Sequence, residues 1–533
     1  MGRNSLLLVV SAAVVLLLYG SGLSHTPPHL HHDEVVIGLQ AHSIAATGRD
    51  FEGRLLPLYF HMPHVGERAW YQPAIVYLTA VFLQLLPATD VSLRMPTAVV
   101  ATLDVLLMFF VARRLFGAAR WGLVAALLLA ATPAHYILGR VAFDFIYPLP
   151  FILGWLLALL VYLDRPEPRR LFVATSILGI GFYSYIASMA MMPLYLAMTL
   201  FLLAAHKVLT PRSAMAAIAG FGWPLLLWIP WLVREPAFVA DVLVRYSVDG
   251  VPRFRFSAIA DRVTLYWTFF NPAFLFLIGG FTHLTATTRL VGVFLLPFIV
   301  LIPLGLVQMV TVARGPWSVV LFAGFLLAPM AAVLTVQEPY ASSRQLPILV
   351  FGVIIATYGV QRALAWRAAA ARALVIGVLA LLPIHFAFFL NHYFGAYHEY
   401  SAAPFEWNHG DALAAIIARN PPDRPQPVFL TTTREQWMDA YWKLALASTR
   451  RQDLLAHTTY FDSTKMATLD SIPASALVLV TVDDKKLLEA VTAGEFAEVM
   501  RFEEPADEPV FFLLRRVSIQ NRPATGDHTT KEP

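Results

Sequence analysis

The sequence predicts an α-helical polytopic membrane protein that carries a small α/β domain at its C-terminal end. Of its 533 residues, 58% are hydrophobic and only 14% are charged, whereas soluble domains carry about 25% charged residues. The apolar residues gather in runs close to the ~20 residues that a membrane-spanning helix needs. After Asn391 the composition changes to that of a soluble domain with short helices and strands.

Charge and cysteine content narrow the class of function. The net charge is +4, but the basic residues lie in short loops between apolar runs, which membrane topology explains better than a nucleic-acid partner. The chain has no Cys, which excludes disulfides, thiolate nucleophiles and Cys-ligated metal sites. It also has no GxxxxGK[ST] or GxGxxG motif after a strand, so nothing indicates nucleotide binding.

About eleven apolar segments are expected to cross the membrane. They are 5–23, 95–112, 121–139, 148–163, two spans within 171–206, 213–232, 290–313, 316–337, 345–360 and 373–390. The first is long enough to be an uncleaved anchor rather than a signal peptide. Residues 72–87 and 266–284 are predicted to be re-entrant or interfacial, because a crossing by either would disturb the orientation of the basic loops.

The basic loops fix the predicted orientation. One alternating set of loops holds Arg113, Arg114, Arg120, Arg165, Arg169, Arg170, Lys207, Arg212, Arg314, Arg362, Arg367 and Arg372. The positive-inside rule places this set in the cytoplasm. The predicted domains are therefore a transmembrane domain (1–390) with a large first outer loop (24–94), a soluble extracytoplasmic domain (391–517) and a disordered tail (518–533).

Within the soluble domain the pattern of apolar residues predicts alternating helices and strands. Helices are expected at 411–419, 435–446 and 485–491, and strands at 428–432 and 476–481, with a closing hairpin of 499–502 and 510–514.

The first outer loop contains the strongest chemical signal. Asp33 and Glu34 are adjacent carboxylates that follow His29, His31 and His32. Such a pair just outside a bilayer could take a proton from an acceptor or hold a cation. The alternative is that it caps the helix that follows. The histidines lack the spacing of an HExxH site, so they indicate metal binding only weakly.

Other charged residues gather on the predicted outer side. Arg140 and Asp144 form either an ordinary ion pair at i, i+4 or part of a site at the membrane boundary. Arg344 and Tyr340 precede a predicted span. The guanidinium fork of Arg344 suits a phosphate, and snorkelling to lipid headgroups is the alternative. A second acidic cluster, Asp50 and Glu52, follows in the first loop.

Several stretches in this order resemble one enzyme family. They are His32-Asp33-Glu34 with GLQAHSIAATGRDFEGRLLPLYF after it, LRMPTAVVATLDVLLMFFVARRLFG, PAHYILGRVAFDF, GFYSYIASMAMMPLYL and Arg344-Gln345-Leu346-Pro347. The chain is similar in these stretches to prokaryotic GT-C glycosyltransferases of the family-39 type, related to protein O-mannosyltransferases and the lipid A aminoarabinose transferase.

The resemblance implies an activity and its residues. It implies a sugar transferase at the outer face of the cytoplasmic membrane, with a polyprenyl-phosphate sugar as donor and an acceptor of unknown class. Asp33 would be the general base and Glu34 its neighbour, and the donor would lie among Arg140, Asp144, Tyr340 and Arg344. Many relatives carry Lys-Pro-Pro where this chain has Tyr71-Gln72-Pro73, so Arg68 is the candidate substitute for that phosphate contact. A divalent metal would help but is not required.

Three other functions remain open at the level of sequence. A transporter or lipid flippase would carry ionisable residues at mid-membrane, whereas the predicted spans, apart from Asp104, are almost free of charged residues. A non-catalytic envelope scaffold would tolerate replacement of Asp33 and Glu34. Another GT-C activity, such as glycan polymerisation or ligation, would use the same residues.

Overall fold

A computed structural model describes residues 3–62, 69–246, 256–280, 286–335, 339–340, 342–433, 436–466, 468–474, 476–506 and 509–517. Its contacts divide the chain into two compact units. The first comprises Met1–Thr26, Gln40–Leu86 and Asp90–Tyr397, and the second comprises Pro27–Leu39, Pro87–Thr89 and His398–Pro533. The second unit therefore includes part of the first loop.

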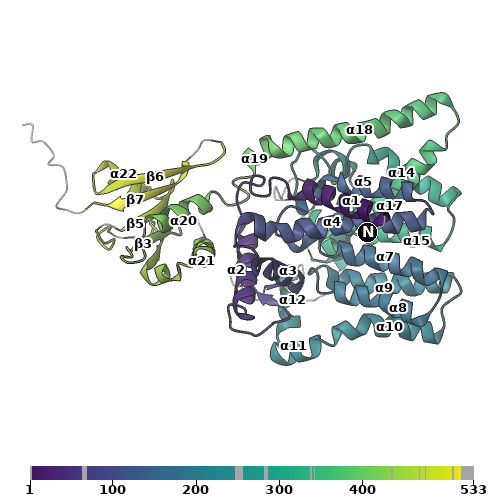
Figure 1. Cartoon of the computed structure of the whole chain (residues 1–533), viewed down its shortest axis with the longest axis horizontal. Helices are drawn as coiled ribbons and strands as arrows, with labels where there is room; N and C mark the ends of the chain where they lie inside the picture. The colour runs from purple at the N-terminus through teal and green to yellow at the C-terminus, as the bar shows by residue number, and fades with distance from the viewer. Residues whose placement is uncertain are drawn as a thin grey trace, which may run out of the picture. The chain divides into compact units, whose positions relative to one another are not determined.

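The first unit is a bundle of apolar helices that lie roughly alongside one another (Figure 1). Its helices are α1 (Arg3–Gly20), the end of α2 (His32–Thr47), α3 (Pro73–Leu83), α4 (Asp90–Leu115), α5 (Ala119–Ala130), α6 (Pro133–Leu138), α7 (Leu149–Asp164), α8 (Pro168–Gly181), α9 (Ser188–Ala205), α10 (Pro211–Leu225), α11 (Trp228–Arg234), α12 (Phe238–Tyr246), α13 (Phe256–Thr268), α14 (Phe298–Thr311), α15 (Pro316–Leu327), α16 (Met330–Thr335), α17 (Pro347–Leu364) and α18 (Ala369–Phe394). The described part of this unit also contains three short turns: η1 (Asp144–Ile146), the π-helical η2 (Phe274–Ile278) and η3 (Ser342–Arg344).

Helix α17 lies at the centre of this bundle. It is buried on nearly all sides, as expected of a helix that is apolar around its whole circumference. It packs against α14, α15, α5 and α7. The contact with α14 is close because Gly305 and Gly359 lie in it, and a Cβ at either would overlap a backbone carbonyl of the facing helix.

Seven helices in the described part of the chain are long and apolar enough to cross a membrane. They cover Asp90–Leu115, Asp144–Asp164, Ser188–Ala205, Pro211–Arg234, Pro316–Thr335, Pro347–Leu364 and Ala369–Phe394. The other four predicted spans fall on α1, α5, α8 and α14, whose apolar helical stretches are shorter. In the 121–139 segment, for example, the helix stops at Ala130 and restarts at Pro133.

The two segments predicted not to cross are short or broken. Helix α3 has 11 residues, about 16 Å, against a hydrocarbon core of about 30 Å. Before it, strands β1 (Phe60–His61) and β2 (Trp70–Tyr71) form a small antiparallel ladder. Helix α13 ends at Thr268 and is followed by the π-helical turn η2.

The second unit contains a five-stranded mixed sheet in the order β4-β3-β5-β7-β6 (Figure 1). Its strands are β3 (Val428–Thr431), β4 (Thr458–Phe461), β5 (Leu477–Thr481), β6 (Phe496–Glu503) and β7 (Pro509–Arg516). Its helical elements are α19 (Ala396–Tyr400, shared with the first unit), α20 (His409–Ala418), α21 (Met438–Thr449), η4 (Gln452–His457) and α22 (Lys485–Thr492). Strands β4, β3 and β5 are parallel, while β7 and β6 are antiparallel neighbours.

The predicted helices and strands of the soluble domain are found within a few residues of their expected positions, while β4 and the short helical elements α19 and η4 were not predicted. Strand β4 reads TTYF and is exposed at its two central positions, so it has neither the continuous apolar run of β5 nor a clean alternation. The sheet buries Val478, Val480 and Phe429 against α22 through Leu487, so the predicted α/β character is confirmed. The predicted tail, 518–533, lies outside the described residues.

Candidate functional site

Asp33 and Glu34 lie in the first turn of α2, but their side chains have different surroundings. Glu34 is fully buried, and its Oε2 accepts the His31 N–H at 3.1 Å. This is the half of a capping box in which an acidic residue at the third helical position reaches back to the N-cap amide. Asp33 keeps 28% of its side chain exposed. Glu34 thus holds the start of the helix, and Asp33 is the carboxylate that solvent can reach.

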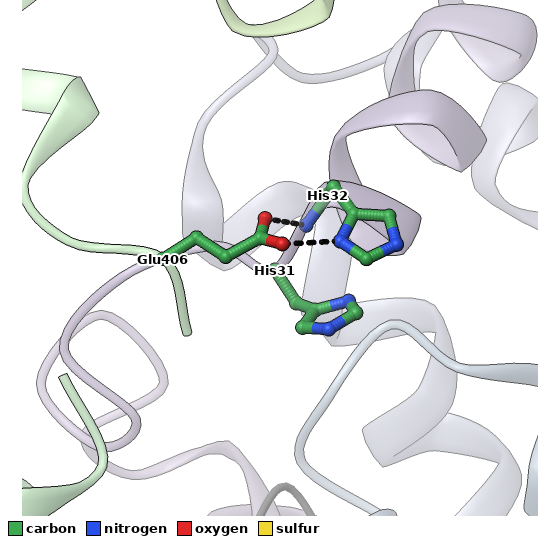
Figure 2. Close-up of side chains that lie close together, drawn as sticks. All are labelled: His31, His32 and Glu406. Atoms are coloured by element: carbon green, nitrogen blue, oxygen red, sulfur yellow. Dashed lines mark hydrogen bonds and ion pairs between the residues drawn. The ribbon is translucent and has the colours of Figure 1, made fainter. Parts of the chain in front are cut away.

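His31 and His32 meet Glu406, which lies more than 370 residues further along the chain (Figure 2). The Glu406 carboxylate accepts two hydrogen bonds from His32, one from the backbone N–H at 2.8 Å and one from Nδ1. The two imidazole rings lie 4.1 Å apart between centroids. Asp33 lies beside both rings, 3.7 Å from His31 Nδ1 and 3.8 Å from His32 Nε2.

Burial and neighbouring charges shift the pKa values of the residues in this cluster in opposite directions. Burial lowers the pKa of His31, and the nearby Asp33 only partly offsets it. Burial also opposes protonation of His32, but its bond to Glu406 and the charge of Asp33 raise its pKa overall. Burial would raise the pKa of Glu406, yet the His32 bond and both imidazoles lower it. The cluster therefore favours a charged carboxylate at Glu406.

Glu406 was not predicted from the sequence. Its Oε2 also accepts the hydroxyl of Tyr441 at 2.7 Å, while Trp437 stacks on His32. Glu406 and Trp407 have φ angles of 61° and 67°, a left-handed conformation that is rare for residues other than Gly, Asn and Asp. A lone carboxylate between aromatic residues, in PFEWNHG, was the one local signal.

The first unit brings the turns of Asp144 and Arg344 together. The turns η1 and η3, which hold these residues, lie in contact although they are 200 positions apart in the chain. Asp144 is nearly buried, and Arg344 Nη1 donates to Thr335 Oγ1 at 2.9 Å. Tyr340 has a φ of 64° and packs its ring 5.3 Å from that of Phe274. Arg68 lies outside the described residues.

Arg140 has its donors satisfied by the chain itself. It is fully buried, and its Nη1 donates to the carbonyls of Tyr19 and Ser21 at 2.7 and 2.6 Å. Its Nη2 donates to the carbonyls of Gly22 and Thr26, and its Nε to the Tyr393 hydroxyl. Helix α6 ends at Leu138, so Arg140 and Asp144 do not share a helix face and the i, i+4 interpretation was wrong. Arg140 holds the turn that follows α1.

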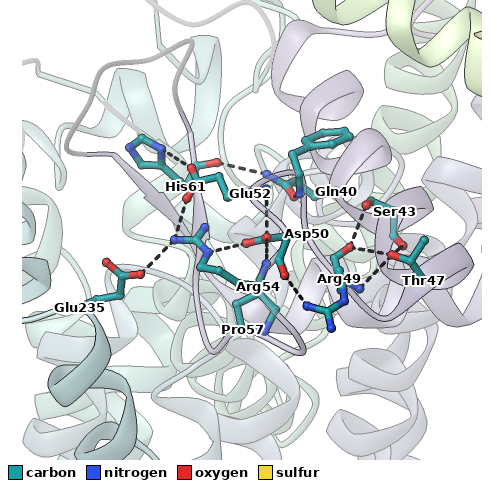
Figure 3. Close-up of polar contacts among 12 residues, drawn as sticks. Gln40, Ser43, Thr47, Arg49, Asp50, Glu52, Arg54, Pro57, His61 and Glu235 are labelled. Atoms are coloured by element: carbon teal, nitrogen blue, oxygen red, sulfur yellow. Dashed lines mark hydrogen bonds and ion pairs between the residues drawn. The ribbon is translucent and has the colours of Figure 1, made fainter.

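A second polar network surrounds Arg54 in the first loop (Figure 3). Arg54 is buried and donates from Nε to Asp50 Oδ2 at 2.6 Å, and its Nη1 lies 3.0 Å from Glu52 and 3.4 Å from Glu235. Its guanidinium lies near the faces of Trp70 and Trp231. Within the described part of the chain, Arg54 Nη2 and both indole N–H groups have no hydrogen-bond partner. These three donors could bind an oxygen of a ligand.

We expect the two carboxylates on Arg54 to differ in what they contribute to stability. Asp50 is buried, so Asp50→Asn should lower the free energy of unfolding by about 3 kcal/mol by leaving a buried guanidinium undercompensated. Glu52 is 45% exposed, so Glu52→Gln should cost below about 1 kcal/mol. Chemical denaturation in detergent, followed by Trp fluorescence, measures both, and equal losses would contradict the assignment.

Comparison with known proteins identifies the fold. Residues 71–233 match the family of dolichyl-phosphate-mannose-protein mannosyltransferases. The chain is also similar to two crystal structures of ArnT from Cupriavidus metallidurans, and each similarity covers 96% of this chain and 98% of that chain. The form bound to undecaprenyl phosphate is 13% identical with a TM-score of 0.56, and the apo form is 14% identical with a TM-score of 0.57. The chain has the GT-C glycosyltransferase fold.

The archaeal oligosaccharyltransferase AglB from Archaeoglobus fulgidus, in complex with an inhibitory peptide and a dolichol-phosphate, is also similar. Its identity is 14%, the similarity covers 98% of this chain and 76% of that chain, and the TM-score is 0.47. No curated protein sequence matches the chain significantly. The predicted fold class and the resemblance to the mannosyltransferase and ArnT group are confirmed. The protein is a multi-pass membrane protein with this fold.

Proposed function

We propose that this GT-C protein is a glycosyltransferase that moves a sugar from a polyprenyl-phosphate donor to an acceptor hydroxyl. The observation that carries the proposal is the similarity, over 96% of the chain, to an ArnT structure bound to undecaprenyl phosphate. We place the reaction at the extracytoplasmic face of the cytoplasmic membrane of a prokaryote. The positive-inside rule puts the basic loops in the cytoplasm, so the loops that hold the proposed site residues face the other side of the membrane. Residues 1–390 then form the membrane domain and 391–517 the outer domain.

In this proposal Asp33 is the general base. It is the partly exposed carboxylate of the α2 first turn, so it can reach an acceptor hydroxyl from solvent. Glu34 positions it by holding the first turn of the helix through the His31 N–H. The two adjacent acids thus have separate roles, one chemical and one structural.

Arg344, Asp144 and Tyr340 are proposed to bind the donor. Arg344 offers a guanidinium fork that matches phosphate oxygens in pairs. The η1 turn that lies against it supplies Asp144, whose carboxylate can orient the guanidinium or accept a sugar hydroxyl. Arg140 is given a positioning role, because its donors bind the carbonyls after α1.

The proposed reaction is a single displacement. The acceptor oxygen attacks the anomeric carbon of the sugar as Asp33 takes its proton, and the bond to the phosphate oxygen breaks on the opposite face. The phosphate monoester of the lipid leaves with the bonding electrons, and basic side chains offset its charge. The configuration at the anomeric carbon of the sugar is therefore inverted.

Transfer can be tested directly with the purified protein in lipid vesicles. The donors are radiolabelled polyprenyl-phosphate sugars, offered as a panel with crude envelope acceptors. The expected result is a labelled acceptor and an equal amount of free polyprenyl phosphate. Movement of the intact lipid-linked sugar across the bilayer, without release of polyprenyl phosphate from any donor, would instead identify a transporter and overturn the proposal.

Arg344→Ala is expected to raise the KM for the donor by about 10- to 100-fold, because a charge-assisted hydrogen bond contributes about 1.5–3 kcal/mol. Arg344→Lys should recover part of this loss, since it keeps the charge but not the fork. Initial rates over a range of donor concentrations measure both. Arg234→Ala, at an exposed arginine in α11, is the control. An unchanged KM in Arg344→Ala would remove this residue from the donor site.

A further inference from the structure

Three side chains of the second unit have the composition and spacing of a metal site. His31, His32 and Glu406 each offer one ligand atom, and these atoms all lie within 4.8 Å of one another (Figure 2). Two imidazoles and one carboxylate are a donor set that Zn²⁺ takes in proteins, with a fourth position left for water. We propose that this cluster binds a divalent transition metal of the Zn²⁺ class.

The backbone directs Glu406 toward the histidines. Two consecutive residues, Glu406 and Trp407, adopt left-handed φ angles, a conformation that residues other than Gly, Asn and Asp seldom adopt. Such a conformation persists where the surrounding contacts fix it. Here it aims the Glu406 carboxylate at the backbone N–H and the Nδ1 of His32. The chain therefore fixes the carboxylate beside the imidazole.

The contacts around the three side chains are of the kind that orient metal ligands. Glu406 Oε2 is held by the Tyr441 hydroxyl at 2.7 Å and by the His32 N–H, so Oε1 is the oxygen directed at the His32 ring. The other ring nitrogen of His32, Nε2, lies 3.8 Å from the Asp33 carboxylate. A carboxylate near the far nitrogen favours the tautomer of a metal-binding imidazole that keeps the proton on that side. Metal at Nδ1 would leave the proton on Nε2, next to Asp33.

His31 separates this proposal from its simplest alternative. Without a metal, His32 and Glu406 form an ion pair, and that pair needs no third residue. His31 lies beside them, its ring 4.1 Å from that of His32 and its side chain 17% exposed. Its Nδ1 accepts the Asp33 backbone N–H at 3.2 Å, a bond that caps the start of α2 and needs neither His32 nor Glu406. A metal uses His31 as the third ligand. The variant that removes His31 therefore discriminates between the two.

A bound metal would join two distant parts of the chain. His31 and His32 begin α2, whereas Glu406 follows α19, so the ion would tie the first loop to the segment that leads into the sheet of the second unit. Any effect of the metal on sugar transfer rests on the proposed function, because the metal would act by orienting Asp33. Metal binding itself does not depend on the proposed function.

The test is metal binding by the full-length protein in detergent. The protein is stripped with a chelator, incubated with Zn²⁺ and desalted, and the metal is counted by plasma mass spectrometry and titrated by calorimetry. We expect one Zn²⁺ per chain for the native protein. His31→Ala and Glu406→Gln should each weaken binding by at least the 10–100-fold that loss of an outer contact causes. Asp33→Asn should weaken it less than either.

His29→Gln is the matched control. His29 lies in the same loop but pairs with Glu504 at 2.6 Å, outside the three-residue cluster, so this variant should bind Zn²⁺ as the native chain does. X-ray absorption of the loaded protein should show imidazole nitrogens and oxygen as ligands, and Zn²⁺ should raise the melting temperature of the native chain but not of His31→Ala. If Glu406→Gln fails to fold, the comparison of His31→Ala with His29→Gln decides. Substoichiometric zinc in the native protein, or equal zinc in His31→Ala, would overturn the metal site whether or not the protein transfers sugar.

Discussion

Asp33→Asn is expected to lower kcat for sugar transfer by about 10²–10⁴-fold, which is the contribution of a positioned general base. The asparagine has the same shape but cannot take the proton of the acceptor hydroxyl. The KM for the donor should stay within a factor of about two, because Asp33 meets the acceptor rather than the phosphate. Single-turnover rates at saturating donor measure the effect.

Two controls separate chemistry from folding in the Asp33→Asn experiment. Asp33 is partly exposed, so the melting temperature of the variant should match that of the native chain. Asp439→Asn removes a more exposed carboxylate (48%) from α21, where it pairs with Lys443 at 2.9 Å, and it should leave kcat unchanged. Native turnover by Asp33→Asn would reject Asp33 as the base and leave Glu34 to be tested next.

The fold class was predictable because it depends on properties that the sequence carries locally. An apolar run of spanning length can be recognised from its own residues, without knowledge of what it packs against. Strand β5 can be recognised in the same way, because it is a short continuous apolar run. Strand β4 was missed because its middle residues are exposed. The interruption between Ala130 and Pro133 shows what hydropathy does not predict. The apolar run continues across this point, but the backbone turns there and the helix ends.

The site was less predictable because its contacts join residues far apart in the chain. Asp33 is conspicuous in the sequence because it lies between a histidine cluster and a second carboxylate. Nothing in the sequence near His32 indicates that Glu406, 374 residues away, will form a hydrogen bond with His32. A left-handed Glu-Trp pair cannot be inferred from residues that seldom adopt that conformation. Glu34 was grouped with Asp33 by adjacency, whereas burial and a bond to the His31 amide give it a structural role.

Arg140 is the sharpest case in which position alone could mislead. Its place at the end of an apolar run suggested a site at the membrane boundary, and the family resemblance implied contact with the donor, but each of its five N–H donors has an acceptor within the chain. Three aromatic rings, those of Tyr136, Tyr393 and Phe394, also surround the guanidinium. Arg140→Met should therefore lower the free energy of unfolding by about 3 kcal/mol or more, because several buried carbonyls lose their partner.

Stability and kinetics together distinguish the two roles of Arg140. Arg140→Lys keeps the charge but loses the planar fork that reaches two carbonyls at once, so it should lie between Arg140→Met and the native chain in denaturation experiments. Arg114→Met is the control, since Arg114 forms an exposed ion pair with Asp164 and its loss should cost below about 1 kcal/mol. If Arg140→Met instead keeps native stability and raises only the KM for the donor, Arg140 binds the phosphate directly. In that case the carbonyls of Tyr19 and Ser21 must release it when the donor arrives.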